Sequence, residues 1–251
     1  MFDLKGHVGV ITGGNGGIGL AMGRGLARAG ASVAVWGRNE EKNAAAIEEL
    51  AALGADAAAF PCDVGEETQV VETMRATIGR FGRVDSCFAN AGVGRTKPFL
   101  ETTVEDWDAV MSVNLVGAFV TFREAARHMV ERGGGGKLVA IASVGSIHGM
   151  PRQSSYSASK AGVCALVRSL AVELARHDIQ ANAILPGWID TDMTSAIQKW
   201  DKLNDAVLHR TPARRWGRPG DFEAVAVYLA SSASRFHTGD VLRLDGGYSI
   251  F

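Results

Sequence analysis

Short apolar runs alternate with longer stretches of helical periodicity along all 251 residues of the chain. The runs are rich in Val, Ile and Ala, as is typical of strands buried on both faces of a parallel sheet. The expected strands lie near residues 7–12, 32–36, 56–61, 84–89, 137–142, 180–185 and 240–243. The expected helices lie near residues 17–29, 39–53, 66–80, 103–131, 155–177 and 220–231. This order predicts an α/β fold with a doubly wound parallel sheet of about seven strands and helices on both faces.

The chain is expected to form a single domain covering residues 1–251. Its glycine-rich breaks, at residues 13–19 and 133–136, do not flank a change in composition that would mark a linker. Only the segment from Pro186 to about Pro219 interrupts the strand-helix rhythm, and it contains three tryptophans. Because long insertions in compact domains often serve as lids, we expect residues 188–216 to cover the substrate.

Charge and composition limit the classes of partner. The formal net charge is -1 and no block of like charges occurs, so binding to nucleic acid or to an anionic membrane is not indicated and a small-molecule substrate is favoured. The first six residues lack the apolar stretch of a secretion signal, and no apolar run is expected to be long enough to span a membrane, which predicts a cytoplasmic protein. Three widely spaced cysteines are interpreted as small buried side chains, and no metal site is expected. They are Cys62, Cys87 and Cys164.

A glycine-rich turn follows the first expected strand and precedes the first expected helix. The segment reads Thr12-Gly13-Gly14-Asn15-Gly16-Gly17-Ile18-Gly19 and satisfies both G-x-G-x-x-G and T-G-x-x-x-G-I-G. Glycines allow the tight turn and a close approach of the backbone to phosphates, while the helix N-terminus offers free N–H groups to an anion. The motif alone is a weak signal, but its position predicts a pyrophosphate-binding turn.

Tyr156 and Lys160 are four residues apart near the start of an expected helix, so their side chains lie on one face. A phenol with a pKa near 10 exchanges protons poorly at neutral pH unless its anion is favoured, and an adjacent ammonium favours that anion. Ser143 lies at the end of an expected strand, where parallel sheets bind ligands, and could hold a carbonyl oxygen. Such a Tyr and Lys spacing is also common on solvated helix faces.

From end to end, the chain resembles the short-chain dehydrogenase/reductase family in its compact single-domain branch. The similarity rests on the glycine turn, on Asp63, on Asn90-Ala91-Gly92 and on the segment from Pro186 to Thr191. Four further residues match the order and spacing of the family's catalytic tetrad: Asn114, Ser143, Tyr156 and Lys160. The resemblance implies a Rossmann-type fold and an NAD(P)-dependent oxidoreductase that interconverts an alcohol and a carbonyl on a small polar substrate, keto-acyl, sugar or polyol-like.

The resemblance also implies a role for each matching residue. Tyr156 would be the general acid/base, Lys160 would bind the nicotinamide ribose and lower the pKa of Tyr156, Ser143 would orient the substrate oxygen, and Asn114 would hold a water in a proton relay. The implied cofactor contacts are Thr12, Gly13, Asn15, Gly17, Ile18, Gly19, Arg38, Asp63, Val64, Asn90, Tyr156, Lys160, Pro186, Gly187, Ile189 and Thr191. The sequence departs from the family pattern at Ala89, which replaces the first Asn of N-N-A-G, and at Gly16, where many NADP-dependent members carry a basic residue.

NADP(H) is favoured as the cofactor, with NAD(H) left open. The second expected strand ends at Gly37-Arg38, where the 2′ position of the adenosine ribose is recognised. An acid there would repel a phosphate, whereas Arg38 offers a guanidinium suited to it. Glu40 and Glu41 offset part of this attraction, and Gly16 adds no second positive charge.

Two other functions use the same residues: an epimerase or dehydratase built on the Tyr and Lys pair, and a cofactor-binding regulator without turnover. The first is disfavoured because similar proteins of that kind are mostly longer, and the second because the tetrad is intact. Self-association to a homo-oligomer, in particular a homotetramer, is expected from the resemblance and from apolar residues on the long helices and at the C-terminal Tyr248-Ser249-Ile250-Phe251.

Overall fold

The computed structural model describes residues 2–251 and contains one parallel sheet of seven strands. The strands follow the spatial order β3-β2-β1-β4-β5-β6-β7, so the winding reverses between β1 and β4. Their bounds are β1 Val8–Thr12, β2 Ser32–Gly37, β3 Ala57–Pro61, β4 Ser86–Ala89, β5 Gly136–Ile141, β6 Ile179–Pro186 and β7 Val241–Leu244. The α/β fold class and all seven expected strands are confirmed.

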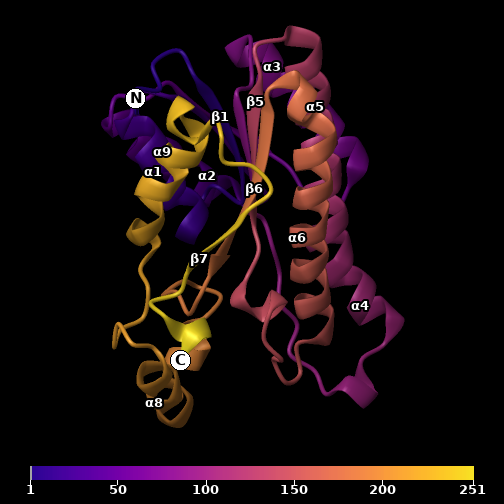
Figure 1. The fold of residues 1–251 in the computed structure, drawn as a ribbon, viewed down its shortest axis with the longest axis vertical. Helices are drawn as coiled ribbons and strands as arrows, with labels where there is room; N and C mark the ends of the chain where they lie inside the picture. The colour runs from indigo at the N-terminus through magenta and orange to yellow at the C-terminus, as the bar shows by residue number, and fades with distance from the viewer. Residues whose placement is uncertain (1) are drawn as a thin grey trace.

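Helices cover both faces of this sheet. They are α1 Gly17–Arg28, α2 Glu40–Ala52, α3 Glu67–Phe81, α4 Val104–Met111, α5 Gly117–Arg132, α6 Ser154–Leu174, α7 Ser195–Gln198, α8 Asp201–Arg210 and α9 Glu223–Ala230. Figure 1 shows α1, α2 and α9 on one side of the strands and α3, α5 and α6 on the other. Each side has its own apolar core, one containing Leu26 and Leu229 and the other Phe122 and Val167. This two-sided burial explains why the strands are apolar at successive positions.

The long helix expected over residues 103–131 is interrupted. Thr103 starts α4 with a capping box to Asp106, but residues Ser112–Val116 form a π-helical turn before α5 continues. The run Val104–Arg132 is long and apolar enough to cross a membrane, which corrects the expectation that no such run exists. In the structure 56% of its most apolar window is buried inside the protein, and α5 packs against α3 and the sheet, as the core helix of a globular domain does.

The segment after β6 contains two helices that the sequence pattern did not predict, α7 and α8. Trp188 and Trp216, near its two ends, pack edge to face with ring centroids 5.7 Å apart, and an isolated parallel bridge joins Ile189 to Gly217. The Trp216 indole donates a hydrogen bond to Asn204 Oδ1 in α8 at 2.8 Å. The base of the segment is thus closed by these contacts. In Figure 1, α8 and the C-terminus lie together at one end of the molecule.

Candidate active site

The glycine turn after β1 lines a cavity of about 300 Å³ at the carboxyl ends of the central strands. Here the winding of the sheet reverses, and open α/β sheets bind their ligands at such a point. Residues that the chain separates widely meet in the wall of this cavity: Gly13, Asn15, Gly17, Ile18, Asn90, Ser143, Tyr156, Lys160, Pro186, Gly187, Ile189 and Thr191. The cavity therefore joins the expected phosphate turn to the expected proton-transfer residues.

The turn requires glycine at several points. Gly13 and Gly17 have φ of +62° and +50°, values that favour glycine, and a Cβ on Gly19 would lie 2.3 Å from the carbonyl oxygen of Gly13. A Cβ on Gly16, by contrast, would meet no atom within 4 Å. The backbone is therefore folded tightly behind the turn and open in front of it, as a cradle for a pyrophosphate must be.

Thr12 and Asn90 hold this turn in place from behind. The Thr12 hydroxyl accepts hydrogen bonds from the backbone N–H groups of Asn90 and Ala91, each at 3.0 Å. The Asn90 amide donates to the carbonyl oxygens of Thr12 at 2.9 Å and Gly13 at 3.0 Å. Thr12 is buried, so it positions the turn through these contacts.

A second cavity of about 160 Å³ continues the groove past the ends of β2 and β3. Arg38, Asp63 and Val64 line it, together with Gly37. The Arg38 guanidinium lies 3.3 Å from the Asp63 carboxylate, and its side chain is 66% exposed. The second cavity thus brings together the residues expected to contact the adenosine half of a dinucleotide.

Ser143, Tyr156 and Lys160 come together where β5 ends and α6 begins. The Ser143 hydroxyl accepts a hydrogen bond from the backbone N–H of Gly145 at 3.0 Å, and Ser143 lies close enough to Tyr156 to influence the pKa of the phenol. The Lys160 ammonium donates to the carbonyl oxygen of Ile141 at 2.7 Å and lies 5.9 Å from the centre of the Tyr156 ring. The two hydroxyl groups therefore face one point in the cavity, with the ammonium beside them.

Burial governs the proton affinities of this cluster. It raises the pKa of Tyr156 above its ordinary value, and the influence of the nearby Ser143 side chain partly counters this. Burial also lowers the pKa of Lys160 to about 8, because a charged ammonium is disfavoured away from water. The sequence predicts that attraction by Lys160 sets the pKa of Tyr156. In the structure, desolvation and Ser143 are the influences that shift it.

Asn114 lies in the π-helical turn, behind the cluster rather than in the wall of the cavity. Its Oδ1 accepts from the backbone N–H of Val93 at 2.8 Å, and its Nδ2 donates to the carbonyl of Val93 and to the hydroxyl of Ser159. A Cβ on Gly92 would lie 3.2 Å from the Lys160 nitrogen and 3.3 Å from Asn114 Oδ1. A side chain at position 92 would thus be crowded against both of these polar groups.

Comparison with known proteins gives this arrangement its family. A family model described as Enoyl-(Acyl carrier protein) reductase matches residues 13–249. A short-chain type dehydrogenase/reductase from Mycobacterium marinum has a crystal structure with a TM-score of 0.94, at 35% identity over 99% of this chain and 97% of that one. The chain belongs to the short-chain dehydrogenase/reductase family.

Other relatives within the short-chain dehydrogenase/reductase family act on sugar acids. The 2-dehydro-3-deoxy-D-gluconate 5-dehydrogenase of Escherichia coli is 37% identical over 98% of this chain and 97% of that protein. A gluconate 5-dehydrogenase from Burkholderia cenocepacia, crystallised with NADP and tartrate, is 38% identical, with a TM-score of 0.95 and coverage of 100% and 98%. These relatives are oxidoreductases of CH–OH groups, and the chain is an oxidoreductase of the same family.

Sequence reasoning missed several residues of this dehydrogenase fold. Lys42, Gly92, Asp192, Met193 and Thr194 also line the main cavity. Lys42 follows Arg38 by four positions, but Arg38 precedes α2, so this spacing is not a helical one. Gly92 is part of the Asn90-Ala91-Gly92 motif, but no sequence signal shows that its missing side chain faces Lys160.

Several polar atoms beyond the tetrad are buried without a hydrogen-bond partner among the described residues. They include His148 Nε2, Gln153 Oε1 and Trp188 Nε1. The Gln153 amide nitrogen donates to the Thr96 hydroxyl at 2.8 Å, and a Cβ on Gly94 would lie within 4 Å of both Gln153 Oε1 and the Tyr156 ring. Gln153 and Tyr156 therefore both lie beside Gly94. Arg95 and Lys97, by contrast, are both paired with Asp106.

Proposed function

We propose that the chain is an NADP(H)-dependent dehydrogenase that interconverts a secondary alcohol and a ketone on a sugar acid. One observation carries the reaction type: the side chains of Ser143, Tyr156 and Lys160 meet in the wall of the cavity that the phosphate turn lines. The sugar-acid relatives support the substrate class. Keto-acyl and polyol substrates belong to the same reaction type and enter the test below.

The cofactor fits the residues present. Gly13, Gly16 and Gly17 would cradle its pyrophosphate, and Thr191, Gly187 and Lys160 would hold its nicotinamide half. A bound nicotinamide supplies or accepts the hydride. NADP(H) is preferred over NAD(H) because Arg38 follows β2 where an acid would select the 2′-hydroxyl, and the related gluconate 5-dehydrogenase structure contains NADP.

The proton steps belong to this chain's own residues. Ser143 donates a hydrogen bond to the substrate oxygen and holds it near Tyr156. The Tyr156 hydroxyl then gives its proton to that oxygen during reduction, or accepts the proton during oxidation. Lys160 stands next to Tyr156 with a pKa near 8, so it exchanges protons readily at neutral to mildly basic pH. A water bound near Lys160 and Asn114, whose polar atoms both lie close to Gly92, would resupply the proton.

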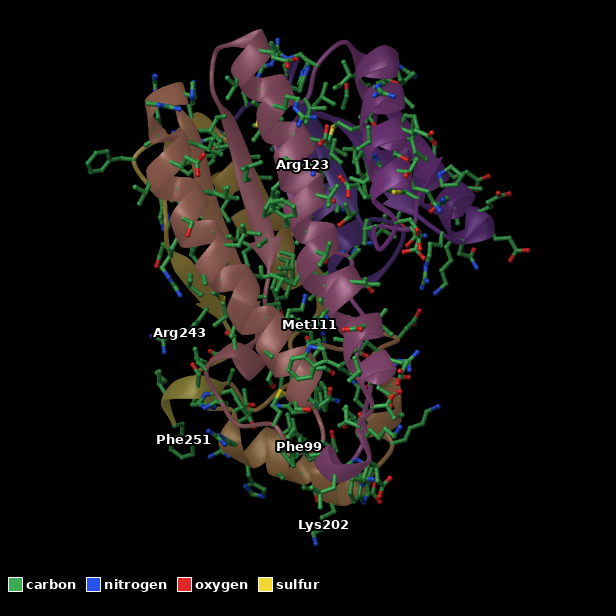
Figure 2. The ribbon with its side chains drawn as sticks, turned by 90° about the vertical axis from the view of Figure 1, so that its right-hand side faces the viewer. Phe99, Met111, Arg123, Lys202, Arg243 and Phe251 are labelled. Atoms are coloured by element: carbon green, nitrogen blue, oxygen red, sulfur yellow. The ribbon has the colours of Figure 1, made fainter. Side chains whose placement is uncertain are left out.

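We also propose that residues 188–216 cover the substrate, that the protein acts in the cytoplasm and that it forms a homotetramer. Three free, buried cysteines suit a reducing compartment. Apolar side chains remain exposed on α5 and α6 and at the C-terminus, among them Phe119, Val172 and Phe251. Figure 2 shows Phe251, Lys202 and Phe99 at the same end of the molecule. Light scattering at micromolar concentration tests the proposed homotetramer, and a mass near that of the 26.5 kDa monomer would contradict it.

The decisive experiment follows nicotinamide absorbance with NADPH, NADH and their oxidised forms against a panel of aldonates, ketoaldonates, polyols and keto-acyl thioesters. We expect the highest kcat/KM for an aldonate and ketoaldonate pair with the phosphorylated cofactor. Preference for a keto-acyl thioester would overturn the substrate class. Cofactor binding without turnover of any substrate would instead support a regulator, and product isomers without net redox change would support an epimerase.

A further inference from the structure

Lys42 stands at the rim of the cofactor groove, in the first turn of α2. Asn39 begins this helix by accepting a hydrogen bond from the Lys42 backbone N–H at 2.8 Å. The Lys42 side chain lines the main cavity with Gly16 and Gly17, and it also lines an open hollow with Asn15, Arg38 and Asn39. Lys42 therefore faces both the phosphate turn and the neighbourhood of Arg38.

The Lys42 ammonium is paired with a residue from the opposite side of the groove. Its nitrogen lies 2.7 Å from Asp192 Oδ2, although the two residues are 150 positions apart in the chain. Asp192 follows Thr191 at the start of the segment over the site, and Lys42 lowers the pKa of its carboxyl group. The two side chains are 55% and 91% exposed, so the pair is well solvated and contributes little to stability. The Lys42 ammonium can therefore leave Asp192 for a more strongly charged partner at little energetic cost.

We propose that Lys42 is a second ligand of the cofactor's 2′-phosphate, and that Asp192 competes with this phosphate for the Lys42 ammonium. The inference rests on the proposed use of NADP(H). Lys42 would supply the second positive charge that the glycine turn lacks. The space in front of Gly16 is open, and Lys42 borders this space from the side of α2.

The charges around the hollow explain why the phosphate wins the competition. Both cations already have a carboxylate partner, Arg38 with Asp63 and Lys42 with Asp192. A phosphate monoester carries roughly twice the charge of a carboxylate at neutral pH and offers three acceptor oxygens, and it would lie at the positive end of the α2 dipole. Glu40 and Glu41, in the same first turn, reduce this advantage without removing it. The 2′-hydroxyl of NAD(H) is uncharged and attracts the ammonium less than the Asp192 carboxylate does, so Lys42 would stay paired with Asp192.

The test measures cofactor binding in the absence of substrate. Fluorescence titration gives the Kd of NADPH and NADH for the wild-type enzyme, Lys42→Met, Asp192→Asn and the double variant. We expect Lys42→Met to weaken NADPH by about fivefold, the effect of one partly solvated charge-assisted contact, and to leave NADH within about twofold. Asp192→Asn should tighten NADPH by about twofold or more, because it removes the competitor. In the Lys42→Met background, Asp192→Asn should change nothing.

The control is Lys5→Met, which removes an equally charged, exposed lysine near the N-terminus and should leave both Kd values unchanged. Equal weakening of NADPH and NADH by Lys42→Met would overturn the inference, because Lys42 would then act on the part that the cofactors share. Weaker NADPH binding by Asp192→Asn would overturn it as well, since the pair would then be a strap over the cofactor. The wild-type preference is read separately: if NADH binds more tightly, the cofactor assignment itself fails, whereas a preference for NADPH without the variant pattern refutes only Lys42 and Asp192.

Discussion

The two ends of the cofactor groove are built differently. At the catalytic end, Asn114 and Lys160 are 1% and 4% exposed. At the adenosine end, the side chains of Arg38 and Lys42 are 66% and 55% exposed and make ion pairs in solvent. The chemistry is thus placed where burial sets proton affinities. Cofactor selection is placed where charges exchange partners at little cost.

The same contrast sets the size and the salt dependence of substitution effects. Electrostatic interactions between buried groups are strong and poorly screened, whereas those between exposed charges are weak and fall with ionic strength. We therefore expect large losses of turnover from the catalytic end and small, cofactor-selective losses from the adenosine end. The following predictions test this contrast, beginning with the largest effect.

Tyr156→Phe removes the transferable proton while the ring still packs. We expect kcat to fall by about a hundredfold or more, as is typical when a general acid/base is lost, with cofactor Kd within a few-fold of wild type. Lys160→Ala should differ by weakening cofactor binding as well. Steady-state kinetics and fluorescence titration provide the two readouts. Retention of more than about a tenth of the wild-type kcat would remove Tyr156 from its role.

Gly92→Ala adds a methyl group beside Lys160 and Asn114. Because the added carbon would lie 3.2 Å from the lysine nitrogen and 3.3 Å from the asparagine oxygen, it displaces any water that connects them. We expect kcat to fall by about tenfold, with an unchanged KM for the substrate. Gly79→Ala on α3 is the matched control, since a Cβ there meets no atom within 4 Å. A Gly92→Ala enzyme with wild-type kcat would show that proton supply does not depend on a water between Lys160 and Asn114.

Arg38→Ala tests the adenosine end. We expect kcat/KM with NADP(H) to fall by about tenfold at low salt and by less at high salt, while NAD(H) is little affected. Kinetics with both cofactors at two ionic strengths measure this effect. Equal losses for the two cofactors would show that Arg38 stacks on the adenine instead, and the exposed end would then not be selective.

The buried ammonium predicts a stability effect that depends on pH. The pKa of Lys160 is lowered to about 8 in the folded protein, below its ordinary value of 10.5. The folded state therefore binds fewer protons than the unfolded state between these values, and stability rises with pH across that window. Relative to Lys160→Met, the wild-type Tm should rise by about 5 °C or more between pH 7.5 and pH 10. If the Tm difference between wild type and Lys160→Met is flat or falls with pH, Lys160 is not desolvated. Lys5→Met, which removes an exposed lysine, is the control for the loss of a lysine that titrates in solvent.

Much of the fold was predictable because burial on both faces leaves a direct trace in the sequence. Val10 and Ile11 are adjacent in β1 yet belong to opposite cores, so the strand is apolar without interruption. The site residues were predictable where a motif fixes them, as at Gly13 and Gly19, whose close approach excludes side chains. The π-helical turn was not predictable, because Ser112–Val116 continues the helical pattern on either side.

The remaining features depend on the distance between residues far apart in the chain. The pairing of Lys42 with Asp192 joins two surface charges that the sequence shows as unrelated. The pKa of Tyr156 follows from burial by segments that meet only in the fold, so the spacing to Lys160 was a poor guide to it. The helices α7 and α8 were missed because the segment containing them has a mixed polar composition rather than a clear periodicity.

The π-helical turn at Ser112–Val116 fixes the rotation of α4 relative to α5 about the helix axis. A helix advances by about 100° per residue, and a π-helical turn accommodates one residue more than an α-helical turn. Deleting one residue there would restore a regular helix and rotate α4 against α5 by about that angle. Asn114 would then face away from Gly92, or Arg123, which Figure 2 labels on α5, and the exposed Phe119 ring that packs against it would turn toward the sheet. An insertion or deletion in Ser112–Val116 would therefore disturb the active site or the outer surface of α5 through one rotation. A single substitution, by contrast, can change one of these two regions alone.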